Sequence, residues 1–254
     1  MRRARPAAGV RFRPLMVGQF VRRLNRFAAL VHVDRREECV HVRNSGRLRE
    51  LLTPGRQVLL ESARGEGRRT RFTLALVGLA HGYVSVDAHL PNAVIEAALR
   101  QGAVPGFRDA RFLRREPAMG QKRADFLVAR GERRCLVEVK SVTLVEDGVA
   151  LFPDAPTARG RAHLTHLVAA RRRGVEAVVL FVIQRSDALA FAPNHRTDPL
   201  FAAALRSAVR AGVRVRAMTC RVTRGGVWLD RSVPVRLAPG SRRVGTSCPD
   251  LESS

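Results

Sequence analysis

Three charged residues, Asp125, Glu138 and Lys140, lie at positions from which they could share one site. The apolar alternation of residues 136–142 predicts a β-strand, and alternate side chains of a strand point to the same face. Glu138 and Lys140 should therefore be neighbours. The residues at 130–132, Arg-Gly-Glu, predict a tight hairpin that brings Asp125 from the preceding strand alongside them.

Two carboxylates and a lysine at this spacing suit the hydrolysis of a phosphodiester. A divalent cation, Mg²⁺ or Mn²⁺, relieves the repulsion between the carboxylates, activates water and polarises a phosphoryl oxygen. Lysine places a compact positive charge where negative charge develops. The chain has only two lysines, Lys122 and Lys140. The position of one of them beside Glu138 favours a functional role for Lys140. The alternative, a Glu–Lys pair on the surface of an amphipathic strand, is less consistent with the neighbouring hairpin and helices.

The charge of the chain indicates a polyanionic partner. Lys and Arg number 46 against 22 Asp and Glu, which gives a net charge of +24 and a pI of about 11.8. Neutralised phosphates release counterions, so nucleic acid is the expected partner, with an anionic membrane surface or an acidic protein as alternatives. A GC-rich genome would explain arginine in place of lysine but not the excess of basic over acidic residues. Aromatic residues make up only 5%, so base stacking should contribute little.

Several functional classes are disfavoured by the sequence. No apolar run approaches the roughly 20 residues that a membrane helix needs, and no secretory signal is recognisable. The four cysteines form no CxxC pair, which disfavours disulfides and zinc and favours a cytoplasmic location. Neither a P-loop nor a GxGxxG turn is present, so we expect no nucleotide cofactor.

The expected fold is mixed α+β, with two domains divided near residue 88. Residues 1–14 are predicted to be a basic flexible arm, and 15–88 a small OB-like barrel, with an SH3-like barrel as the alternative. Its strands are expected within 20–33, 39–42, 58–61, 70–77 and 83–86, with one helical turn at 48–52. Residues 89–238 predict the order helix, three strands, helix, strand, with helices over 93–100, 157–173 and 198–211. Asn92, Gly174 and Asp198 are the expected helix boundaries. Residues 239–254 are predicted to be a disordered tail.

The sequence resembles the sugar fermentation stimulation protein family (SfsA) over about residues 12–237. The resemblance rests on the block at 137–144 followed by Phe-Pro-Asp-Ala at 152–155, Thr-Ala-Arg-Gly at 157–160 and His-Leu at 163–164, and on the Asn-Ser-Gly-Arg-Leu run at 44–48. It implies an OB-like domain followed by an αβββαβ domain of the PD-(D/E)xK nuclease type. It also implies DNA binding with little sequence preference, and a nuclease activity on DNA or also RNA. A non-catalytic DNA-binding regulator of sugar (maltose) metabolism on a nuclease scaffold is the alternative, and the oligomeric state is left open.

The resemblance also assigns roles to individual residues. Asp125, Glu138 and Lys140 match the catalytic D…ExK signature, and Glu96 matches an acidic residue that would join Asp125 and Glu138 as a metal ligand. Nucleic-acid contacts are expected from the block after the third strand, from the barrel and from the segment before Asp125: Arg159, His163, Arg23, Arg26, Arg47 and Arg123. A family lysine before the histidine is replaced here by Ala162.

Overall fold

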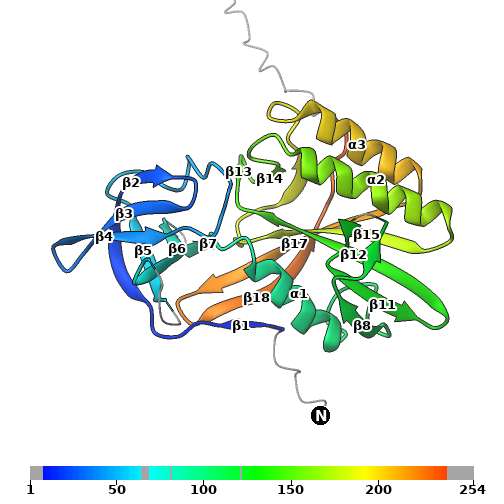
Figure 1. The fold of residues 1–254 in the computed structure, drawn as a ribbon, viewed down its shortest axis with the longest axis horizontal. Helices are drawn as coiled ribbons and strands as arrows, with labels where there is room; N and C mark the ends of the chain where they lie inside the picture. The colour runs from blue at the N-terminus through cyan, green and yellow to red at the C-terminus, as the bar shows by residue number, and fades with distance from the viewer. Residues whose placement is uncertain (1–7, 64–68, 81, 121, 239–254) are drawn as a thin grey trace, which may run out of the picture.

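The computed structural model describes residues 8–63, 69–80, 82–120 and 122–238, which form a barrel beside a larger layered domain (Figure 1). The predicted disordered tail, and the first seven residues of the predicted arm, lie outside the described residues. No helix of the described chain is long and apolar enough to cross a membrane.

The N-terminal domain is the expected OB barrel. Five strands form it: β2 (Met16–Asn25), β3 (Ala28–Val33), β4 (Arg36–His41), β5 (Gln57–Ser62) and β6 (Phe72–Leu79). A parallel pairing of β4 with β6 closes the barrel, and β7 (Gly82–Ser85) extends it along β6. Side chains that point inward from the strands, such as Phe20, Val31 and Leu74, fill the core of the barrel. The helical turn predicted at 48–52 is present as a single turn, in which the amides of Leu51 (3.1 Å) and Leu52 (2.9 Å) donate to the carbonyl of Leu48.

The second domain is built on a seven-stranded sheet in the order β1-β18-β17-β15-β12-β11-β8. Its strands are β1 (Gly9–Arg11), β8 (Arg111–Arg115), β11 (Phe126–Arg130), β12 (Arg133–Val142), β15 (Glu176–Ile183), β17 (Arg214–Thr223) and β18 (Gly226–Val233). The central strands β12, β15 and β17 are parallel and lie between helix layers, which explains their long apolar runs. The hairpin predicted at 130–132 joins β11 to β12.

Helices α1, α2 and α3 of the described chain cover the two faces of this sheet (Figure 1). Helix α1 (Leu90–Arg100) packs on one face with Val137 and Val139, whereas α2 (Ala158–Arg172) and α3 (Pro199–Arg210) pack on the other. The order helix, three strands, helix, strand is therefore present. Short strands that we did not predict interrupt it: β9 (Ala118–Met119), β10 (Lys122–Arg123), β13 (Val145–Glu146), β14 (Val149–Phe152) and β16 (Ala190–Pro193).

Two local predictions need correction. Part of the predicted flexible arm is ordered, because Gly9–Arg11 pairs antiparallel with β18 and forms an edge of the large sheet. Asn92 does not cap α1: the helix begins earlier, after His89, with Pro91 in its first turn. Proline supplies a fixed φ and needs no amide partner there, so the helix can start without a side-chain cap.

Asp198 joins the beginnings of α2 and α3. Its carboxylate accepts hydrogen bonds from the amides of Thr157 (2.8 Å) and Phe201 (2.8 Å) and from the guanidinium of Arg161 (2.8 Å). Burial alone would raise the pKa of Asp198, but these partners outweigh burial and hold it below the ordinary value. The predicted cap at Asp198 is thus confirmed, and it serves two helices.

We expect Asp198→Ala to lower the free energy of unfolding by about 2 kcal/mol or more at pH 7, because it removes a cap and charged hydrogen bonds. A carboxylate with a lowered folded-state pKa stabilises fully above its unfolded pKa of about 3.9 and loses that effect as the pH falls. The difference in free energy of unfolding between wild type and Asp198→Ala should therefore be smaller at pH 3 than at pH 7 in urea titrations. Asp198→Asn, which can still cap, should lose less; a deficit equal at both pH values would contradict this account.

Candidate active site

Glu138, on the central strand β12, is the most buried charged residue of the predicted site. Its side chain is 2% exposed, and its Oε1 accepts a hydrogen bond from Lys140 Nζ at 2.6 Å and contacts Nδ1 of His163 from α2. Its Oε2 is buried and has no hydrogen-bond partner in the described chain. One oxygen is thus held in place by two neighbours, and the other is left available.

Asp125 lies beside Glu138, as the hairpin predicts. It directly precedes β11, and its Oδ2 accepts a hydrogen bond from the amide of Val139 at 2.7 Å. Its Oδ1 accepts another from Nδ2 of Asn92 on α1, also at 2.7 Å. Each carboxylate oxygen can accept more than one bond, so both retain capacity for a ligand.

The two carboxylates differ in how firmly they hold a proton. Burial, followed by the charge of Glu138, raises the pKa of Asp125 above its ordinary value, although hydrogen bonds from Val139 and Asn92 oppose the rise. Burial would also raise the pKa of Glu138, but His163 and Lys140 outweigh burial and lower it. Close carboxylates that share a site behave in this way, because they cannot both ionise at low cost.

Glu96 is not brought to this pair. Its Oε1 accepts from Arg100 Nη2 at 2.8 Å, and its Oε2 lies 3.4 Å from Arg115 Nη1. Among the described residues, no three His, Cys, Asp or Glu side chains are grouped so that they could hold a metal together. The α1 residue that contacts the site is Asn92, one turn before Glu96, so the structure does not support Glu96 as a ligand.

Asp125 and Glu138 nevertheless suit a divalent cation. The donors are carboxylate oxygens, which Mg²⁺ and Mn²⁺ prefer over softer ligands. Within the described chain the buried Oε2 of Glu138 has no hydrogen-bond partner, which is costly for a buried polar atom, and a bound cation would supply one. Two protein carboxylates are enough for Mg²⁺, since this ion usually keeps several of its waters.

The six residues predicted to bind nucleic acid divide into two groups. Arg23 is structural: its guanidinium donates to the backbone carbonyls of Gly46 (2.7 Å), Arg47 (3.0 Å) and Asn44 (3.0 Å) and also to that of Arg26. Burial lowers the pKa of Arg23, and the nearby charge of Asp154 opposes that shift. His163 is 6% exposed and turned to Glu138, so its position suits orienting that carboxylate rather than contacting phosphate.

The other four arginines reach solvent. Arg26, Arg47 and Arg159 are exposed, and within the described chain no side-chain partner is found for them. Arg123 is also exposed but forms an ion pair of 3.1 Å with Glu116. Arg26, Arg47 and Arg159 are therefore the candidates best placed to meet phosphate.

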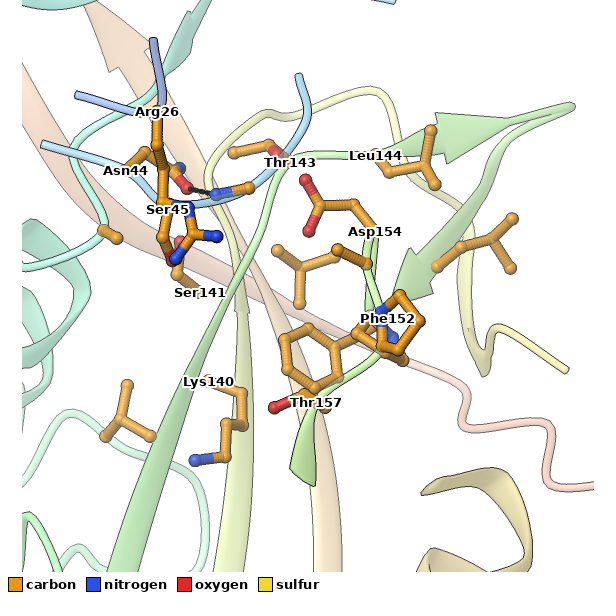
Figure 2. A pocket seen from close by; sticks show the side chains of 18 residues that line it. Arg26, Asn44, Ser45, Lys140, Ser141, Thr143, Leu144, Phe152, Asp154 and Thr157 are labelled. Carbon is orange, nitrogen blue, oxygen red and sulfur yellow. Dashed lines mark hydrogen bonds between the residues drawn. The ribbon is translucent and has the colours of Figure 1, made fainter. Parts of the chain in front are cut away.

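A cleft of about 410 Å³ opens beside Lys140, between the barrel and the large sheet. The barrel contributes Arg26 and the Asn44–Gly46 loop, which is pinned by a 2.8 Å hydrogen bond from the Gly46 amide to Asn44 Oδ1 (Figure 2). The end of β12 and the segment after β14 form the opposite wall. In Figure 2 the carboxylate of Asp154 and the side chain of Lys140 lie toward different ends of this cleft.

Sequence reasoning missed Asn92 and Asp154 in this region, and it expected His163 to contact nucleic acid, whereas the structure turns His163 to Glu138. Asn92 precedes Glu96 by four positions, so the same helix face was recognised but one turn too late. Asp154 lies in the Phe-Pro-Asp-Ala run that carried the resemblance, but no spacing rule pairs it with the barrel.

Comparison with known proteins agrees with this architecture. Residues 21–86 match the SfsA N-terminal OB domain, and residues 89–226 match the sugar fermentation stimulation protein RE domain. A sugar fermentation stimulation protein homolog of Caldanaerobacter subterraneus is 42% identical over 88% of this chain and 98% of its own length. A homolog from Natranaerobius thermophilus is 44% identical over 87% of this chain and 94% of its own. The solved structure of Pyrococcus furiosus SfsA in complex with Ca²⁺ has a TM-score of 0.84 at 30% identity, covering 92% of this chain and all of that one.

Proposed function

The chain belongs to the sugar fermentation stimulation protein family, and from this premise and the geometry of the site we propose that it is a divalent-cation-dependent nuclease. The observation that carries the proposal is the buried Glu138, which lies beside Asp125. Lys140 and His163 contact one of its carboxylate oxygens, and the other has no hydrogen-bond partner in the described chain. The similar protein from Pyrococcus furiosus was solved in complex with Ca²⁺, which supports the binding of a divalent cation by this chain.

Asp125 and Glu138 would hold the cation, each kept in place by neighbours on other elements. Asn92 and the Val139 amide orient Asp125, and His163 orients Glu138. When bound, Mg²⁺ or Mn²⁺ supplies a Lewis acid that polarises a phosphoryl oxygen and makes water easier to deprotonate.

Besides the cation, Lys140 supplies a positively charged side chain at the site. Its side chain is 14% exposed and lines the cleft, where a phosphate can reach it. There it stabilises negative charge that develops on the phosphate, or orients the attacking water. The excess of arginine over the whole chain would hold the nucleic acid by its backbone, with little dependence on sequence.

The direct test is cleavage of single- and double-stranded DNA and RNA with Mg²⁺, with Mn²⁺ and with EDTA. We expect cleavage with either cation and none with EDTA. Binding without cleavage under every condition would overturn the proposal and favour a DNA-binding regulator on a nuclease scaffold.

We expect Arg26→Ala to weaken the binding of a short single-stranded DNA and to reduce the slope of log affinity against log salt by about 0.7, the value for one phosphate contact. The guanidinium of Arg26 is exposed at the cleft, whereas Arg36 begins β4 elsewhere on the barrel surface. Fluorescence anisotropy at several salt concentrations measures both slopes, with Arg36→Ala as the matched control. If the salt slope of Arg26→Ala equals that of wild type, Arg26 does not contact phosphate.

A further inference from the structure

We propose that the cleft between the barrel and the large sheet holds one unpaired nucleotide beside the scissile phosphate, with guanine as the preferred base. This inference rests on the proposed nuclease function, because Lys140 belongs both to the candidate active site and to the cleft wall.

The size of the cleft selects an unpaired nucleotide. A volume of about 410 Å³ lies at the lower end of the range of pockets that enclose small ligands. One nucleotide belongs to that size class, whereas a base pair within a duplex does not. A base in a duplex would have to leave its stack to enter, which costs a few kcal/mol and is cheapest for unpaired strands.

The charges of the cleft give the nucleotide a direction. Lys140 is a cationic group of the lining that can meet phosphate, whereas Asp154, toward the other end, would repel it (Figure 2). The end at Asp154 must therefore receive hydrogen-bond donors. An ionised carboxylate is an acceptor with two oxygens. The charge of Asp154 acts on the nearby Arg23, but within the described chain no hydrogen bond to Asp154 is found.

Phe152 and Pro153 provide apolar surface on the same wall as Asp154. The Phe152 ring is held by Phe201 and Phe181, with centroid distances of 5.1 Å and 5.5 Å, so it is a fixed surface. A flat base can pack on such a surface and turn its edge toward the carboxylate.

Among the four DNA bases, guanine fits that carboxylate best. Its N1–H and N2 amino group are adjacent donors that can bond to the two oxygens together. Adenine and cytosine place a ring acceptor next to the amino group, and thymine places carbonyls on both sides of its N3–H. A bidentate base contact gives about 1–3 kcal/mol of discrimination, which corresponds to roughly 5- to 150-fold in affinity.

Gly46 of the barrel fixes where the Asp154 carboxylate can lie. A Cβ at residue 46 would stand 2.3 Å from Asp154 Oδ2 and 2.9 Å from Asn44 Oδ1. Both atoms end flexible side chains, so Gly46→Ala should displace the Asp154 carboxylate while its charge remains. The variant therefore separates the position of the carboxylate from its charge.

The test compares the affinity of full-length protein for nine-nucleotide single-stranded DNAs, in Ca²⁺ and by fluorescence anisotropy. The probes are an all-thymine strand and the same strand with one central guanine, adenine, cytosine or inosine. We expect wild type to bind the guanine strand at least about 5-fold more tightly than the others. Inosine lacks the 2-amino group and should lose most of this advantage. Pairing the guanine strand in a duplex should abolish it.

Asp154→Asn and Gly46→Ala should each reduce the guanine preference, the ratio of the affinities for the guanine and all-thymine strands, to less than 2-fold. Asp34→Asn is the matched control, because Asp34 is exposed in the β3–β4 turn with a φ of 47°, which asparagine tolerates. No guanine preference in wild type, or one that persists in Asp154→Asn, would overturn the inference. Guanine preference in a protein that never cleaves would contradict only the nuclease proposal.

Discussion

Glu138→Gln and Asp125→Asn should each lower metal-dependent cleavage at least about 100-fold while the affinity for nucleic acid stays close to that of wild type. Replacing a residue that merely supports a metal ligand already costs 10- to 100-fold, so losing a ligand's charge should cost no less. Phosphate capture depends on the many arginines, so removing one negative charge can only tighten binding slightly.

These isosteric variants are preferable to alanine at Glu138. With alanine, the buried His163 and Lys140 would lose their common partner, and lost activity could reflect a disturbed fold. Cleavage rates in Mg²⁺ and anisotropy in EDTA measure the two effects separately, with Asp34→Asn as the control for a lost surface charge. Wild-type cleavage by both variants would place the activity elsewhere in the molecule or in a contaminant.

The arrangement of β12 could be predicted because it depends on local rules. Alternation in a strand places Glu138 and Lys140 on one face, and a glycine turn at 131 leaves few ways to join two strands other than a hairpin. The continuous apolar run of β15 likewise has one common explanation, a central strand covered on both faces.

The structure departs from the sequence-based expectations where a contact depends on tertiary packing. Arg23 looks like any other barrel arginine in the sequence, yet its guanidinium donates hydrogen bonds to backbone carbonyls about twenty residues away. Glu96 and Asn92 lie on one helix face, and only the rotation of α1 against the sheet decides which of them meets Asp125. The pairing of Gly9–Arg11 with β18 joins the two ends of the described chain, and no local pattern specifies it.

We expect Lys140→Arg to lose about 100-fold in cleavage rate although the positive charge is kept. The ammonium of Lys140 lies 2.6 Å from Glu138 Oε1, and the Lys140 side chain is only 14% exposed, which leaves little space for a wider group. Guanidinium is planar and larger, so it should move the charge by about an ångström, and a misplacement of that size can cost about 100-fold. Single-turnover cleavage in Mg²⁺ gives the rate, with Lys122→Arg as the matched control, because Lys122 is exposed in the short strand β10. If Lys140→Arg cleaves like wild type, then Lys140 is only an ion-pair partner of Glu138 and the phosphate is stabilised by another group.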